Sequence, residues 1–213
     1  MNLNNQKQII NYFLENNPII KGSAKRPYII LFDGISGTGK STIARIISEK
    51  LDVVVLNNDK VRQFLSRTNY IKKSRYPLLA SQKLVKKIQY YRIKESIKNN
   101  NICVLDGNVI NGFEDYIKFF KRNNIKYYIV KIKYNRRKVI KRLYKRKFDP
   151  KTFFINGSET INYSEANIMS FIYMEKNKRE LPSEEIYFRI DTSKSYRDIE
   201  KKVLELINKI ESE

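Results

Sequence analysis

Residues 34–41 have the types and spacing of a phosphate-binding loop. They read Gly-Ile-Ser-Gly-Thr-Gly-Lys-Ser, which fits the pattern G-x-x-x-x-G-K-[ST]. Gly34, Gly37 and Gly39 let the backbone wrap tightly, so that successive N–H groups point at an anion. Lys40 is long enough to reach the β- and γ-phosphates of a nucleoside triphosphate, and Ser41 offers a hydroxyl to Mg²⁺.

The segments on either side of this loop are those that a phosphate site needs. The apolar run 28–32 ends at Asp33 and predicts a buried strand, and the apolar spacing in 42–47 predicts a helix over 40–51. The positive N-terminal end of that helix would attract phosphate, which makes a glycine turn without a ligand the weaker interpretation. We therefore expect ATP to contact Gly34, Ser36, Gly37, Thr38, Gly39, Lys40, Ser41 and Thr42.

A carboxylate at the end of a second apolar run is the candidate metal ligand. Residues 102–105 predict a strand next to the phosphate loop, and Asp106 follows it directly. At that position its carboxylate would hold Mg²⁺ beside Ser41, directly or through water. The alternative is an aspartate that caps a helix or closes a turn.

Asp59 and Arg62 follow a third predicted strand, over 53–56, and form the candidate acceptor site. Asp59 would begin a helix beside the phosphates, where a carboxylate can accept a proton from an attacking hydroxyl. Arg62 lies one helical turn further on the same face and could bind a phosphate of the acceptor with two hydrogen bonds. The alternative is a capping aspartate with an arginine that faces solvent.

A strongly basic segment, 135–147, predicts a helix that would form a lid together with a loop over 148–162. Arg142 and Arg146 are four residues apart and therefore share one face, which suits the charge of a triphosphate during phosphoryl transfer. The alternatives are a solvated basic face and a track for nucleic acid.

The composition excludes several classes of chemistry. The chain has no histidine, so His-based triads and His zinc sites are absent, and any general base must be a carboxylate, Lys or Tyr. Cys103 is the single cysteine, which excludes an intrachain disulfide and favours a reducing, cytoplasmic location. No apolar run approaches the roughly 18–20 residues that span a membrane, and the polar N-terminus lacks a signal-peptide core.

The chain carries 43 Lys and Arg against 22 acidic residues, a formal net charge of +21. Such a charge favours polyanions, which makes single-stranded nucleic acid a candidate partner. The alternative is a composition bias, because lysine is spread along the whole chain.

The order of the predicted elements indicates an α/β fold. We expect an N-terminal helix and basic connector over 1–26, followed by one domain over 27–213 with its lid at about 135–162. Strands and helices alternate in this domain, which predicts three layers around a five-stranded parallel sheet. The remaining expected elements are helices over 78–98, 113–123, 163–179 and 196–210 and strands over 127–132 and 186–190.

With these motifs in this order, the chain resembles the small P-loop kinases, a superfamily that includes polynucleotide 5′-kinases, zeta toxins, adenylylsulfate kinases and gluconate- or nucleotide-type kinases. The closest local matches are to polynucleotide kinases: residues 58–62 resemble their Asp-x-x-Arg, 105–108 their Asp-x-Asn, and 140–146 their Arg-rich lid. This resemblance implies that Asp59 is the base, that Arg62 and Asn108 bind the acceptor, and that Thr192 lies near the adenine.

The leading hypothesis is an ATP- and Mg²⁺-dependent kinase that phosphorylates a hydroxyl, with Lys40, Asp59, Arg142 and Arg146 as its catalytic residues. A nucleic-acid 5′-hydroxyl or a nucleotide is the favoured acceptor, from the pair Asp59 and Arg62 and from the net charge of +21. A metabolite or sugar-nucleotide kinase is the alternative within the same class. The rival from another class is a nucleotide-dependent, RNA-binding regulator with little turnover.

Overall fold

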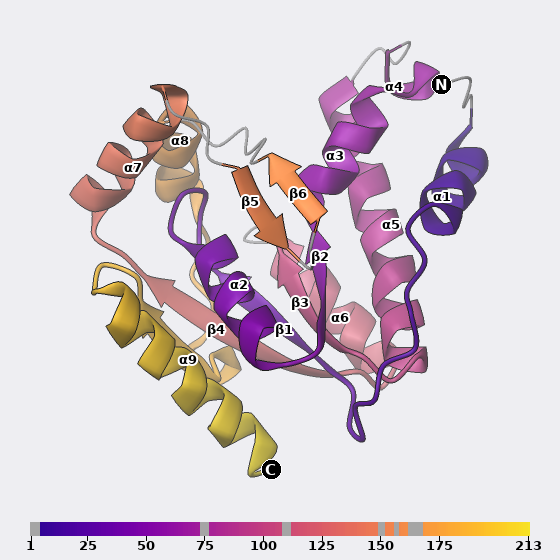
Figure 1. The fold of residues 1–213 in the computed structure, drawn as a ribbon. Helices are drawn as coiled ribbons and strands as arrows, with labels where there is room; N and C mark the ends of the chain where they lie inside the picture. Colours follow the sequence, from indigo (N-terminus) through magenta and orange to yellow (C-terminus); the bar gives the residue numbers. More distant parts are fainter. Residues whose placement is uncertain (1–4, 73–76, 108–111, 149–151, 156–157, 162–167) are drawn as a thin grey trace.

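Five parallel strands form the central sheet of the computed structural model, in the order β2-β3-β1-β4-β7 (Figure 1). The structure describes residues 5–72, 77–107, 112–148, 152–155, 158–161 and 168–213, with side chains except at 77–80, 146–148, 152–155 and 158–161. The strands are β1 (Tyr28–Asp33), β2 (Val53–Asn57), β3 (Ile102–Asp106), β4 (Lys126–Lys133) and β7 (Phe188–Asp191). The prediction of a five-stranded parallel sheet is confirmed.

The central strand β1 explains why its sequence is continuously apolar. All six of its residues are buried, and its Leu31 lies in register with Leu105 of β3 on one side and Ile129 of β4 on the other. A parallel sheet is covered on both faces, so its strands do not alternate between polar and apolar residues. β1 therefore places the phosphate loop at the middle of the carboxyl edge.

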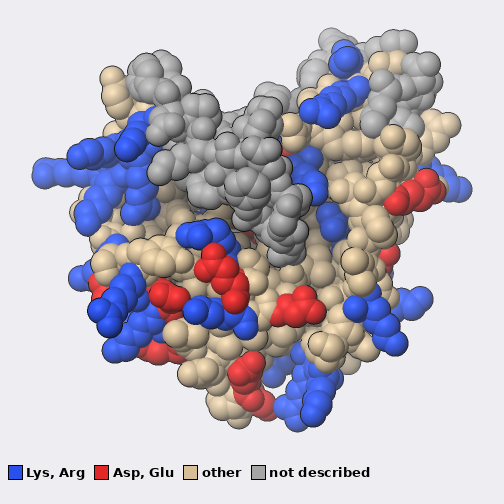
Figure 2. All heavy atoms as spheres, viewed as in Figure 1, with Lys and Arg blue, Asp and Glu red and all other residues tan. Residues whose placement is uncertain are grey.

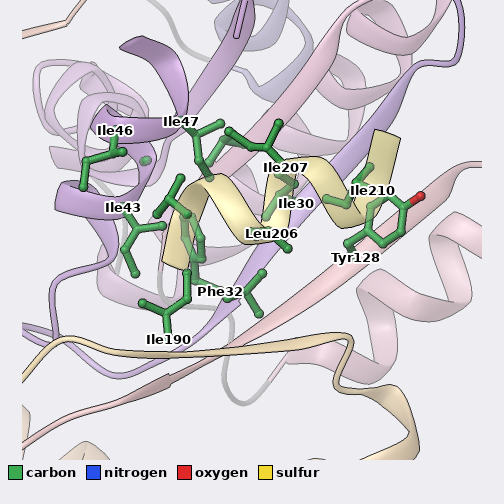
Figure 3. Packing of buried hydrophobic residues seen from close by; sticks show 14 of the residues in the cluster. Ile30, Phe32, Ile43, Ile46, Ile47, Tyr128, Ile190, Leu206, Ile207 and Ile210 are labelled. Carbon is green, nitrogen blue, oxygen red and sulfur yellow. The ribbon is translucent and has the colours of Figure 1, made fainter. Parts of the chain in front are cut away.

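Helices α2 (Lys40–Lys50) and α9 (Tyr196–Glu211) cover one face of the sheet. Figure 3 shows Ile43 and Ile47 of α2 packed with Leu206 of α9 over Phe32 of β1. The other face packs against α5 (Pro77–Lys98), α6 (Phe113–Arg122), α7 (Arg136–Phe148) and α8 (Ile168–Asn177). The predicted three layers are confirmed.

A separate apolar cluster joins α1 (Gln6–Glu15) to α3 (Asn58–Ser66), α4 (Asn69–Lys72) and α5. Ile9 and Phe13 of α1 pack in it with Val61 and Leu65 of α3. Figure 1 shows α1, α3 and α5 side by side next to β2. The helix that carries the candidate base in its first turn is therefore supported by the helix that precedes the sheet in the chain.

The predicted loop over 148–162 is the main error in the expected elements. The structure has an antiparallel pair there, β5 (Thr152–Ile155) with β6 (Ser158–Ile161). The dipeptide Asn156-Gly157 between them is a hairpin signal that the sequence analysis overlooked. Three other differences are small. The short helix α4 was not expected, α8 is described over Ile168–Asn177 within the expected 163–179, and the last strand begins at Phe188 after the short helix η2 (Ser183–Glu185). None of the described helices has the length and apolar character needed to cross a membrane.

Candidate functional site

The phosphate loop connects β1 to α2 and depends on left-handed backbone at two of its glycines. Gly37 has a φ of 79° and Gly39 a φ of 96°, a region where a side chain is strained. A Cβ on Gly37 would also lie 2.9 Å from Leu143 of α7. The loop conformation and the close approach of the lid helix therefore both require glycine at this position.

Two polar side chains of the loop bind the same backbone carbonyl. Lys40 Nζ donates to the Ile35 carbonyl at 2.8 Å, and Thr38 Oγ1 donates to it at 2.7 Å. Lys40 is 8% exposed, and Thr38 is fully buried. The ammonium group of Lys40 therefore lies against its own loop, within reach of the position that a bound phosphate would take.

The segment after β7 joins the loop to α7. The buried Thr192 donates through Oγ1 to the Thr38 carbonyl at 2.7 Å, and its own carbonyl accepts from Arg142 Nη2 at 2.7 Å. The family resemblance implies that Thr192 lies near the adenine. In the structure its hydroxyl binds the backbone of the phosphate loop. Arg142 lies beside that loop, whereas the side chain of Arg146 lies outside the described residues.

Asp106 and Ser41 lie together, as a Mg²⁺ site requires. The Ser41 hydroxyl donates to Asp106 Oδ1 at 3.2 Å, and Asn57 Nδ2 donates to Asp106 Oδ2 at 3.1 Å. Asp106 is 5% exposed, and burial raises the pKa of its carboxyl above the ordinary value although Lys40 opposes this shift. A carboxylate and a hydroxyl are oxygen ligands of the kind that Mg²⁺ takes, with phosphate oxygens and water completing its shell.

Asp59 and Arg62 form an ion pair at the start of α3. Arg62 Nη1 lies 2.5 Å from Asp59 Oδ1, with the two side chains 31% and 39% exposed respectively. The N-cap of α3 is Asn57, not Asp59. The alternative in which Asp59 caps this helix is therefore wrong, because its carboxylate binds Arg62 instead. Asp59 follows the end of β2, whose last residue Asn57 lies in register with Asp106 at the end of β3, so the two carboxylates lie at the same edge of the sheet.

Sequence reasoning missed the amides that connect the ends of β2 and β3. Asn58 is 3% exposed, and its Oδ1 accepts from Gln89 Nε2 at 2.8 Å. A Cβ on Gly107 would lie 2.1 Å from Asn58 Nδ2, so this glycine is needed for close approach. The two consecutive asparagines at 57 and 58, directly after the predicted strand over 53–56, were the sequence feature that could have indicated these amide contacts. The predicted acceptor residue Asn108 lies outside the described residues.

A cavity of about 620 Å³ lies at the carboxyl ends of β4 and β7, on the side of the loop away from Asp59. Its lining includes Lys131, Lys178, Glu180 and Asp191. Lys178 Nζ lies 3.4 Å from the fully buried Asp33, whose pKa is raised by burial. This cavity is separate from the side chains that would handle an acceptor hydroxyl.

Basic side chains are spread over the molecule and are densest on α7. Figure 2 shows Lys and Arg over several parts of the visible face, with Asp and Glu between them. In α7 itself, eight of 13 residues are Lys or Arg and none is acidic. The excess charge is therefore not one isolated patch, but it is concentrated beside the phosphate loop.

Comparisons with known proteins identify a family for the chain and support its fold. The model of the AAA_33 family, an AAA domain, matches residues 29–167. No curated protein matches the chain significantly.

Three solved structures illustrate the similarity of fold. The APS kinase CysC of Mycobacterium tuberculosis, in complex with AMPPNP and APS, is 15% identical with a TM-score of 0.54 and covers 86% of this chain and 98% of its own. The shikimate kinase of Acinetobacter baumannii, in complex with shikimate, is 19% identical with a TM-score of 0.54, covering 87% and 94%. A structure from the PezAT chromosomal toxin–antitoxin system of Streptococcus pneumoniae is 14% identical with a TM-score of 0.54, covering 96% and 93%.

Proposed function

The chain belongs to the AAA_33 family and has a P-loop kinase fold, and from this premise we propose that it is an ATP- and Mg²⁺-dependent kinase that phosphorylates a hydroxyl group. One observation carries the proposal. The phosphate loop, the pair Ser41 and Asp106, and the pair Asp59 and Arg62 meet at one carboxyl edge of the sheet. A phosphate donor, a metal and a general base are the parts that such a transfer needs.

The donor side would hold the triphosphate through backbone and charge. The loop amides and Lys40 bind the β- and γ-phosphates, while Arg142 approaches from α7 and adds positive charge. Ser41 and Asp106 would hold Mg²⁺, which when bound neutralises charge on the phosphate oxygens. Arg146, four residues after Arg142 in the same helix, is proposed to assist it.

The acceptor side would move one proton. Asp59 accepts the proton of the acceptor hydroxyl as that oxygen bonds to the γ-phosphorus, and the bond from phosphorus to the β-phosphate oxygen breaks to leave ADP. Arg62 would exchange its contact with Asp59 for a phosphate on the acceptor, which frees the carboxylate to act as the base. Asn108 is proposed as a further acceptor contact.

We propose a nucleic-acid 5′-hydroxyl or a nucleotide as the acceptor. Arg62 beside the base suits an acceptor that carries a phosphate, and the basic helix α7 beside the phosphate loop suits a polyanion. A small metabolite is the second candidate, because two of the compared structures are named as kinases of APS and of shikimate.

A screen of acceptors with ATP labelled in its γ-phosphate separates these candidates. Short single-stranded oligonucleotides with a 5′-hydroxyl should become labelled, and their binding should weaken steeply with salt. Contacts with about four phosphates of a single strand give a log–log slope near −3, whereas one phosphate gives a slope of about −1 or shallower. Label on small molecules alone would assign a metabolite kinase, and nucleotide binding without any transfer would favour a regulator with little turnover.

A further inference from the structure

Asn57 contacts both the candidate metal carboxylate and the helix that carries the candidate base. It is the last residue of β2 and lies in register with Asp106, the last residue of β3. Its Nδ2 donates to Asp106 Oδ2 at 3.1 Å, and its Oδ1 accepts from the backbone N–H of Lys60 at 2.9 Å. The second bond caps α3, which carries Asp59 in its first turn. One amide therefore joins the metal carboxylate to the helix of the base.

Only a short amide side chain satisfies both contacts. Asp, Ser and Thr are good helix caps because their oxygens accept from the first turn. An ionised aspartate has no donor for the Asp106 carboxylate, and a serine offers a single, shorter hydroxyl. The two partners also fix the orientation of the amide, since its NH₂ must face the carboxylate and its oxygen the N–H.

Contacts that do not involve Asn57 also hold the segments around it. The next residue, Asn58, is buried and bound to Gln89 of α5, and its side chain fills the space beside Gly107. The ends of β2 and β3 are therefore held at a fixed separation by packing that does not involve Asn57. What remains for Asn57 to fix is the rotation of the Asp106 carboxylate and the first turn of α3.

We propose that Asn57 is a positioning residue that orients the Mg²⁺ carboxylate and the general base relative to each other. With Oδ2 of Asp106 held by the amide, Oδ1 is directed to Ser41, which it contacts at 3.2 Å. With Lys60 N–H held by the same amide, the turn that carries Asp59 begins at a fixed place. This inference rests on the proposed kinase function.

Two substitutions separate the contact of Asn57 with Asp106 from its cap of α3. Asn57→Ser keeps a capping oxygen but loses the donor to Asp106, whereas Asn57→Ala loses both. Asn5→Ser is the matched control, because Asn5 caps α1 with an equal distance of 2.9 Å and has no carboxylate partner among the residues that the structure describes. The readouts are the Mg²⁺ concentration for half-maximal transfer, kcat at saturating Mg²⁺, the Mg²⁺ dependence of ADP binding by calorimetry, and the melting temperature.

For Asn57→Ser we expect the half-saturating Mg²⁺ concentration to rise about 10-fold or more, since a bond to a charged group is lost. Its kcat at saturating Mg²⁺ should stay within about 3-fold, because the cap survives. Asn57→Ala should show the same Mg²⁺ shift with kcat lowered about 5-fold further, as expected from loss of a cap. Asn5→Ser should change neither quantity.

Wild-type Mg²⁺ dependence in Asn57→Ser, in both ADP binding and transfer, would overturn the proposal. Equal kcat values in Asn57→Ser and Asn57→Ala would show that the cap of α3 by Asn57 does not position the base. A lower melting temperature with no Mg²⁺ shift would reduce Asn57 to an ordinary cap. If the wild-type protein transfers no phosphate, the proposed function fails, while the Mg²⁺ dependence of ADP binding still tests the contact with Asp106.

Discussion

The phosphate side and the acceptor side of the candidate site are held in different ways. On the phosphate side, residues 33–41 are contiguous, and the contacts within the loop and the contact from Thr192 end on backbone carbonyls: Lys40 and Thr38 bind Ile35, and Thr192 binds Thr38. Around the acceptor side and its boundary with the metal carboxylate, contacts run between side chains of β2 and β3 and of α3 and α5. Asn57 and Asp106, for example, are 49 positions apart in the chain.

This difference predicts how each side responds to substitution. A loop held by its backbone keeps its shape when one side chain is removed, so loss of Lys40 should remove chemistry and leave the fold intact. A cluster held by side chains changes its geometry when one partner changes, so substitutions there should alter positioning, metal affinity or stability as well.

The largest effect is expected at Asp59, which tests the chemistry of the acceptor side alone. If Asp59 is the base, Asp59→Asn should lower kcat by about 10²–10⁴-fold with little change in ATP affinity. Steady-state kinetics with the identified acceptor would measure it, and Asp52→Asn, at an exposed residue before β2, is the control. Nearly full activity in Asp59→Asn would show that Asp59 is not the general base.

A smaller effect is expected at Arg62, which tests binding on the same side. Arg62→Ala should raise KM for a phosphate-bearing acceptor by about 10- to 100-fold, because a charged hydrogen bond is lost. The hydrolysis of ATP without acceptor should change much less. Arg67→Ala, at the exposed C-cap of the same helix, is the control. An equal loss in acceptor phosphorylation and ATP hydrolysis would contradict a role in acceptor binding.

Gly107 tests whether the acceptor side depends on close packing. A Cβ there meets Asn58 Nδ2 at 2.1 Å, whereas a Cβ on Gly112 meets nothing within 4 Å. Gly107→Ala should therefore lower the free energy of unfolding by about 1–3 kcal/mol. Gly112→Ala adds no overlap and should cost less, about 0.5 kcal/mol, because Gly112 is the N-cap of α6 and Ala caps a helix less well than Gly. Thermal unfolding of both variants measures the difference. Similar melting temperatures would show that Asn58 moves aside easily.

The smallest effect concerns the buried charge of Asp106. Burial raises the pKa of the Asp106 carboxyl in the folded protein above the ordinary value of 3.8. The unfolded chain therefore releases the carboxyl proton at a lower pH than the folded protein does. Above both pKa values the carboxylate is charged in both states, and its burial opposes folding. Asp106→Asn should therefore raise the melting temperature of the nucleotide-free protein at neutral pH. Mg²⁺-dependent transfer should be lost in the same variant.

The sign of that prediction can be checked with pH. As the pH falls through the raised pKa toward 3.8, the wild-type carboxyl becomes neutral in the folded state, so the advantage of Asp106→Asn should shrink. Melting curves of both proteins across this window measure the difference. An advantage that stays constant with pH would show that the buried charge is not its cause.

The same contrast explains what could be predicted from the sequence. The phosphate loop is local, and its glycines and lysine specify it without knowledge of the rest of the fold. The sheet followed from apolar runs, each of which ends in a polar residue such as Asp33 or Asp106. The roles of Asn57 and Gly107 could not be predicted, because they depend on the register of β2 with β3, which no local pattern encodes.

Two other features show different limits of sequence reasoning. The segment expected as a lid loop over 148–162 contains the hairpin of β5 and β6, for which the dipeptide Asn156-Gly157 is a local signal. Thr192 was expected at the adenine through family resemblance, and only the structure reveals its bond to the Thr38 carbonyl.

The transfer of the labelled γ-phosphate of ATP by wild-type protein and by Lys40→Ala tests the central proposal most directly. Loss of this charged contact should remove roughly 2–4 kcal/mol of transition-state stabilisation, or about 30- to 1000-fold in rate, with the melting temperature preserved. Lys50→Ala, at the opposite end of α2, should keep wild-type rates. Equal transfer by wild-type protein and folded Lys40→Ala would contradict the kinase proposal.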